Sequence, residues 1–368
     1  MVPLAWAFRL AGHEVTFAAA GDALAVRDAG FLTLDAVPGL TTARMIADFK
    51  EGPAAERLQQ PREGISPEEL EQIKPLVVAM WDGYVDGHVR LAERLRPDLI
   101  VYDPIFTAGP VAAAKLGVPC VAHSYGVGGF EPEIFDRAPA NEAFLRHGVT
   151  VPKGIETIGV VPPSLEIGLR PRWSMRYTPY NGGGLLPEWL LDEGDRPRVA
   201  VTLGTVVPET HGLGEFAPII EAAEAVDAEF VIATGSGETS WSTPLPPNVR
   251  VTGWVPLGAL LRGSAAAIHH GGAGTTLTCS ALGVPQLILP NGADRHINAE
   301  TLAARGSALT TLIGDLEVPL IERLLTDEAL RATAHEVRAE IEALPTPVEI
   351  AAELAALYTP DALRPAVV

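Results

Sequence analysis

The chain has 368 residues, with 27 lysines and arginines against 46 aspartates and glutamates, and its formal net charge is −19. A chain of this length usually divides into two domains. So large an excess of negative charge repels nucleic acid and anionic membrane surfaces, so we expect neither as a partner.

The first half of the chain alternates short helices with short apolar strands. We expect helices over Leu4–Leu10 and Val111–Leu116, and strands over Val15–Ala18, Leu99–Val101 and Val118–Ala122. Apolar runs with little alternation suit strands that are buried on both faces, as in a parallel sheet. Two long segments rich in glycine, proline and charge, 37–67 and 124–152, interrupt this pattern. We interpret them as walls of a substrate pocket, with disorder as the alternative.

The second half repeats the rhythm after a stretch that opposes regular structure. That stretch, residues 172–198, reads RWSMRYTPYNGGGLLPEWLLDEGDRPR. Strand candidates follow at Val199–Leu203, Phe230–Ala233, Val249–Thr252, Ala265–His269 and Gln286–Leu289. Helical segments alternate with these strands, which predicts an α/β fold of two Rossmann-like, doubly wound parallel-sheet domains.

The cysteines and the first residues indicate the compartment. Cys120 and Cys279 lie far apart and have no partner at the spacing of metal ligands, which favours reduced thiols in the cytosol. The N-terminal run MVPLAWAFRLAGHEV lacks a basic leader, and no apolar run is long enough to span a bilayer. We therefore expect a cytoplasmic protein without membrane insertion.

The most informative motif lies where a small apolar strand meets a helix. The sequence HHGGAGTT places His270, Gly272 and Gly274 before Thr275 and Thr276, which open the helix. Glycine lets a backbone approach a ligand closely, and the free N–H groups and dipole of a helix N-terminus favour an anion. The hydroxyls and the imidazole add donors, and the imidazole donates more strongly when protonated. We therefore predict a diphosphate site, although the glycines alone would fit a tight turn without a ligand.

This segment resembles the donor-binding signature of the family 1 glycosyltransferases, which have the GT-B fold. HHGGAGT, ALGVPQLILP, Asp294 and Asn298–Ala299 follow in the family's order, and GHEVTFA, PDLIVYDP, AAKLGVP, VTLGT and GWVPLGALL also fit. The run RYTPYNGGGLLPEWL is most similar to the actinobacterial branch that attaches deoxysugars to polyketides and other natural products.

The resemblance implies a division of labour along the chain. Residues 1–180 would form an acceptor-binding domain, 181–197 the linker and 198–344 the donor-binding domain, and a C-terminal helix within 345–368 would cross back to the first domain. The matched positions assign the donor to Thr205, Trp254, Val255, His270, Gly272, Gly274, Thr275, Thr276, Asp294 and Arg295.

Each assignment has an alternative in the residues themselves. Thr205 could be a strand-end cap, and Trp254 would more often be part of a core. The family commonly has glutamine after the acid matched by Asp294, and Arg295 stands there instead. Arg295 could bind the sugar, pair with Asp294 or point to solvent.

The resemblance also implies transfer without a metal and with inversion of the anomeric carbon. The helix terminus would stabilise the departing diphosphate, and the acceptor hydroxyl needs a general base. Asp103 matches the acid of the family's catalytic dyad, and the partner histidine belongs to a loop that would precede the segment VPLAWA. We therefore expect the first strand and the base to be missing, through a start annotated too late, a truncation or lost catalysis, and we favour the first.

The leading hypothesis is a glycosyltransferase that uses a nucleoside-diphosphate deoxysugar, thymidine-linked (TDP), and a hydrophobic natural-product acceptor. His123 at a strand end is our candidate for the acceptor pocket, with a structural histidine as the alternative. No cofactor is expected, and a homodimer is left open. The alternatives are a donor-binding protein without turnover and a nucleotide-sugar epimerase of the same fold.

Overall fold

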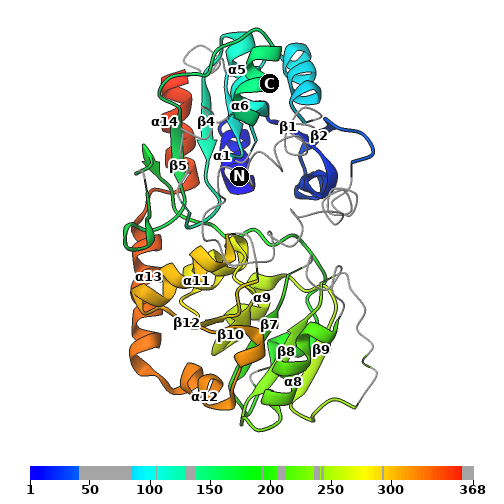
Figure 1. Ribbon diagram of the computed structural model, residues 1–368, viewed down its shortest axis with the longest axis vertical. Coiled ribbons are helices and arrows are strands. Elements are labelled where there is room, and N and C mark those ends of the chain that lie inside the picture. Colours follow the sequence, from blue (N-terminus) through cyan, green and yellow to red (C-terminus); the bar gives the residue numbers. More distant parts are fainter. Residues whose placement is uncertain are drawn as a thin grey trace.

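A computed structural model describes residues 1–40, 84–104, 106–128, 138–168, 170–192, 194–204, 213–235, 241, 244–291 and 294–358. These residues form two bodies, one from each half of the chain, with the N-terminal body uppermost in Figure 1. Each body has parallel strands with helices packed against them, which confirms the predicted α/β class. Most of the segment 37–67 lies outside the described residues, whereas the segment 124–152 contains the helix α6.

The C-terminal body is built on a six-stranded sheet with the order β12-β11-β10-β7-β8-β9. Its strands are β7 (Arg198–Thr202), β8 (Glu229–Ala233), β9 (Val249–Thr252), β10 (Ala266–His269), β11 (Gln286–Ile288) and β12 (Ala308–Thr310). All neighbours are parallel, and Thr202 is paired in register with His269. The chain runs outward from β7 to β9 and then restarts on the other side of β7. The carboxyl ends of β7 and β10 therefore flank the topological switch point, where ligands bind in folds of this kind.

Helices cover both faces of this sheet. They are α8 (Ala217–Ala223), α9 (Leu257–Arg262), α10 (Ala273–Leu282), α11 (Arg295–Arg305), α12 (Val318–Thr326) and α13 (Glu328–Ala343). Side chains of strand β7 point alternately into the two cores on either side of the sheet. Val199 and Val201 pack with Phe230 on one face, and Ala200 packs with Leu260 on the other. Burial on both faces explains why the strands are apolar runs without alternation.

The N-terminal body holds a four-stranded parallel sheet with the order β3-β4-β5-β6 and a separate parallel pair, β1-β2. The strands are β1 (Thr16–Ala19), β2 (Leu32–Asp35), β3 (Ile100–Tyr102), β4 (Cys120–His123), β5 (Glu156–Gly159) and β6 (Trp173–Ser174). The helices are α1 (Val2–Leu10), a helix over 84–95, α5 (Ala108–Leu116) and α6 (Ala138–Arg146). Short 3₁₀ segments in the two bodies are η1 (Gly21–Ala29), η3 (Pro163–Leu165), η4 (Glu188–Leu191), η5 (Leu213–Phe216) and η6 (Ile313–Asp315).

The two bodies are joined by apolar packing and by two adjacent chain crossings. The last described helix, α14 (Pro347–Tyr358), packs against α1 in the upper body of Figure 1. Beside that crossing, the Arg176 N–H donates to the carbonyl of Pro345 at 2.7 Å. One buried cluster includes Phe8 and Ile158 from the first body and Val337 from the second. No helix among the described residues is long and apolar enough to cross a membrane.

Candidate donor site at the switch point of the second sheet

The loop after β10 lies at the switch point, and we call residues 270–276 the corner. His269, just before it, is fully buried, and its Nε2–H donates to Gln286 Oε1 at 2.9 Å. Its Nδ1 accepts the Gly271 N–H at 3.1 Å. Of the paired histidines, His269 therefore fixes the turn from inside and does not face a ligand.

His270 lies between two glycine backbones. A Cβ added to Gly272 would come within 2.5 Å of His270 Nε2, and one added to Gly204 within 2.8 Å of Cε1. Only glycine leaves room for the ring at these two places, and Gly204 also has φ +76°. The imidazole is buried, and its Nδ1 has no hydrogen-bond partner in the described part of the chain.

The sequence left open a protonated His270, which would donate more strongly, but the structure favours the neutral ring. Burial lowers the pKa of His270 to about 3, and the charges of Arg295 and His269 act in the same direction. The ring is therefore neutral near pH 7, and a hydrogen bond from it to a phosphate would come from a neutral imidazole.

The first turn of α10 is open. Gly272 is the N-cap, no side chain of the described residues caps the helix, and the first helical bond runs from the Thr276 N–H to the Gly272 carbonyl. The N–H groups of Ala273, Gly274 and Thr275 precede that bond and have no helical acceptor. Gly274 is exposed, and a Cβ built on it would meet no atom within 4 Å. Thr276, by contrast, is fully buried, and its hydroxyl has no hydrogen-bond partner in the part of the chain that the structure describes.

Asp294 lies beside the corner and is held there by Asn298. The Asn298 amide donates to the Gly271 carbonyl at 2.8 Å and to Asp294 Oδ2 at 3.1 Å. Arg295 donates from Nη1 to the carbonyl of Asn291 at 2.6 Å, and although burial lowers the pKa of its guanidinium, the charge of Asp294 acts to raise it. Asn298 is thus a buried residue that ties the loop after β10 to the start of α11.

The first body closes over the corner with the loop after β4. A Cβ on Gly126 would lie 3.2 Å from Ala273 Cβ and 3.7 Å from Asp294 Oδ2. His123, at the end of β4, is buried, and its Nδ1 lies 2.7 Å from the Ser124 carbonyl, so Nδ1 carries the proton and Nε2 has no partner among the described residues. Asp103 follows the neighbouring strand β3 and is half-buried.

Trp254 and Val255 differ sharply in exposure. Val255 is buried, whereas Trp254 is 50 % exposed, so the alternative that Trp254 is plain core is wrong. Its indole Nε1–H donates to the Gly183 carbonyl at 3.3 Å. Thr205 lies outside the described residues.

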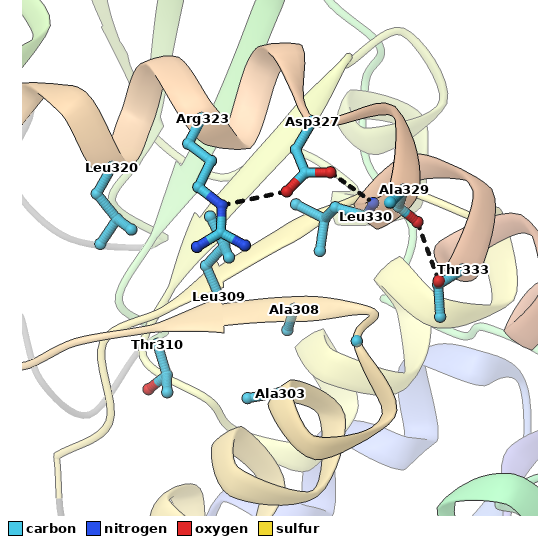
Figure 2. Close-up of a pocket in the computed structure, with 11 residues that line it drawn as sticks. Ala303, Ala308, Leu309, Thr310, Leu320, Arg323, Asp327, Ala329, Leu330 and Thr333 are labelled. Carbon is cyan, nitrogen blue, oxygen red and sulfur yellow. Dashed lines mark hydrogen bonds and ion pairs between the residues drawn. The ribbon is translucent and has the colours of Figure 1, made fainter.

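A hollow of about 460 Å³ lies elsewhere, beside the edge strand β12 (Figure 2). Its walls are mainly apolar side chains of α11, β12, α12 and α13, with one charged pair. Arg323 Nε lies 3.1 Å from Asp327 Oδ2, and Asp327 Oδ1 accepts the Leu330 N–H at 3.0 Å to cap α13. Because these charged groups already serve the helices, we assign no ligand to this hollow.

Three buried histidines predict that the fold is sensitive to acid. Burial lowers the pKa values of His123 and His270 to about 3 and that of His269 to about 4. The unfolded chain, with histidine pKa values near 6.5, therefore binds more protons than the folded chain as the pH falls below 6.5. We expect the free energy of unfolding to drop by about 1.4 kcal/mol per pH unit for each histidine below that pH.

Urea unfolding at pH 7.5, 6.0 and 5.0 measures this loss. The variant His123→Asn removes one of the three titrating groups and should flatten the slope by roughly a third. Equal free energies of unfolding at pH 7.5 and 5.0 would show that the three rings take up protons within the fold.

Comparisons with known proteins show which family of proteins the chain belongs to. The chain belongs to a family of GT-B glycosyltransferases from actinobacterial antibiotic pathways. Models described as Erythromycin biosynthesis protein CIII-like match it twice, the N-terminal domain over residues 6–204 and the C-terminal domain over 217–357. The expected family, fold and enzyme class are therefore confirmed.

Particular relatives match along nearly their whole length. Elloramycin glycosyltransferase ElmGT of Streptomyces olivaceus is 36 % identical over 365 residues, which span 96 % of this chain and 92 % of that protein. The crystal structure of the glycosyltransferase SnogD from Streptomyces nogalater has a TM-score of 0.80 at 38 % identity, covering 97 % and 94 % of the two chains. Glycosyltransferase VinC, solved in complex with DTDP, has a TM-score of 0.78 at 30 % identity and covers 98 % and 96 %.

Proposed function

We propose that this glycosyltransferase moves a deoxysugar from thymidine diphosphate to a hydrophobic natural-product acceptor such as a polyketide. The observation that carries the proposal is the first turn of α10 at the switch point, where N–H groups without a helical acceptor lie beside a neutral histidine. The likeness to VinC, whose structure holds DTDP, supports the choice of nucleotide.

In this proposal the donor lies along the second body. The diphosphate binds the corner through the Gly272–Thr275 backbone, the hydroxyls of Thr275 and Thr276, and His270. The nucleobase packs against the exposed face of Trp254, next to Val255. The sugar hydroxyls bind Asp294, and Arg295 and Thr205 complete the set. Asp294 suits this role because Asn298 already fixes one of its carboxylate oxygens.

Each part of the chain has a separate function in this proposal. Residues 1–180 bind the acceptor, 181–197 link the bodies, 198–344 bind the donor, and the segment from 345 returns to the first body. The approach of Gly126 to Asp294 supports an acceptor pocket formed at the ends of β3 and β4, where Asp103 and His123 lie.

The proposed reaction inverts the anomeric carbon and uses no metal. The acceptor oxygen bonds to the anomeric carbon as the bond from that carbon to the diphosphate oxygen breaks, and the acceptor proton passes to a general base in the acceptor pocket. The corner's N–H groups stabilise the negative charge that builds on the departing diphosphate. The neutral His270 adds a donor without having to lose a proton.

A transfer assay tests the proposal. The chain is incubated with a TDP-deoxysugar and a panel of polyketide aglycones, and the products are identified by mass spectrometry and by NMR of the new anomeric centre. We expect a glycoside of inverted configuration and one equivalent of thymidine diphosphate. Tight binding of thymidine diphosphate with no glycoside from any aglycone would favour a donor-binding protein without turnover.

A further inference from the structure

The segment between β6 and β7 contacts the proposed donor site at two places. Tyr177 and Asn181 reach α10, and Gly183 accepts the hydrogen bond of Trp254. Part of this segment was expected to be a linker, and the family resemblance assigns no role to these residues. We infer, on the basis of the proposed function, that Tyr177 and Asn181 are positioning residues for the amide that binds the diphosphate.

Tyr177 bonds the carbonyl of Gly274 directly, and Asn181 acts on it through Thr278. Thr278 Oγ1 donates to that carbonyl at 2.6 Å, and Tyr177 Oη donates to it at 3.2 Å. A threonine hydroxyl has one proton, so Thr278 Oγ1 is left as an acceptor. It takes the Asn181 Nδ2–H at 3.3 Å and lies 3.3 Å from Tyr177 Oη.

Fixing this carbonyl also fixes an N–H group of the corner. The carbonyl of Gly274 and the N–H of Thr275 belong to one planar trans peptide, so they point in opposite directions. The carbonyl points along the helix toward Thr278, and the N–H therefore points out of the open first turn. The three side chains thus hold the Thr275 N–H in the direction from which the diphosphate would approach.

A threonine that bonds the carbonyl four residues earlier is ordinary in a helix. Thr333 does the same with Ala329 at 2.9 Å, as Figure 2 shows. The difference at Thr278 is that a phenol and an amide from another segment join the bond. Tyr177 is also partly buried, and burial raises the pKa of its hydroxyl, which stays protonated as a donor.

Asn181 also connects this hydrogen-bond network to the region where the nucleobase is proposed to bind. Its Oδ1 accepts the Gly258 N–H at 3.1 Å, so one side chain ties α9 to α10. Next to it, Gly182 has φ +75° and its missing Cβ would lie 3.0 Å from the Trp254 ring. The same short segment therefore sets the position of the corner amide and of the indole, which are the two ends of the proposed donor.

Calorimetric titration with thymidine diphosphate and with thymidine separates a positioning role from general packing. For Tyr177→Phe we expect affinity for thymidine diphosphate to fall by about 3- to 10-fold, the effect of losing one neutral hydrogen bond. Asn181→Ala loses two hydrogen bonds, to Thr278 and from Gly258, and should weaken thymidine diphosphate at least as much. Affinity of Tyr177→Phe for thymidine, which lacks the diphosphate, should stay within about twofold. Equal losses for both ligands, or no loss for either, would overturn the inference.

Variants of Thr278 supply the matched comparison. Thr278→Ser keeps the hydroxyl and should bind thymidine diphosphate like the unmodified chain, whereas Thr278→Val should lose affinity as Tyr177→Phe does. Thr333→Val removes the equivalent bond in α13 and should change nothing. If Thr278→Ser and Thr278→Val behave alike, the hydroxyl has no positioning role. If the unmodified chain does not bind thymidine diphosphate at all, the proposed function fails, and the inference fails with it.

Discussion

Replacing His270 by alanine is expected to lower the rate of sugar transfer about 100-fold, the usual effect of removing one donor that stabilises a developing anion. The ring lies between Gly204 and Gly272, so the substitution removes a side chain that contributes little to the apolar core. The fold should therefore survive. Steady-state kinetics with a saturating acceptor measure kcat, and titration with thymidine diphosphate measures the loss of donor affinity.

His335 provides the control for this variant. It is exposed on α13, away from the corner, and His335→Ala should keep the rate of the unmodified chain. If His270→Ala keeps kcat/KM within about threefold, the imidazole does not contact the diphosphate in the transition state.

Gly274→Ala is expected to make the fold more stable while weakening the binding of thymidine diphosphate. Gly274 has negative φ and lies in the first turn of α10, and a Cβ there meets nothing within 4 Å, so alanine should stabilise the chain by about 0.5–1 kcal/mol. The same methyl group would stand where the diphosphate approaches the amides. Loss of one hydrogen bond to a charged group should weaken thymidine diphosphate by about 10- to 100-fold.

Urea unfolding and calorimetric titration on the same sample measure both effects. Gly314→Ala is the matched control, because Gly314 in η6 also has open space around its missing Cβ. That variant should leave donor binding unchanged. A Gly274→Ala variant that is more stable and binds thymidine diphosphate as tightly as before would place the diphosphate away from the corner.

Much of the fold could be predicted because local signals agree with the packing. The strand expected at Val249–Thr252 has those bounds, and the strand expected at Ala265–His269 begins one residue later. Helix ends were marked by glycine: Gly117 and Gly283 adopt left-handed conformations after α5 and α10. Each of these features depends on neighbouring residues, so the sequence alone carries it.

The site was predicted less completely because several of its features depend on residues distant in the sequence. Tyr177 and Gly274 are 97 positions apart, and no periodicity connects them. The approach of Gly126 to Asp294 requires the two bodies to be placed relative to each other. The neutral state of His270 follows from burial, which a motif does not encode.

The sequence motif did not distinguish the roles of the two adjacent histidines, whereas the structure does. Both were part of the motif, yet His269 bonds Gln286 inside the sheet while His270 lies at the open end. Strand alternation would have separated them, since neighbouring residues at a strand end point to opposite faces.

A crystal structure of the chain with thymidine diphosphate tests the central claim most directly. We predict phosphate oxygens within hydrogen-bond distance of the N–H groups of Gly274 and Thr275 and of the His270 ring, and a thymine against Trp254. A nucleotide bound at another surface, with the first turn of α10 still open to solvent, would contradict the account.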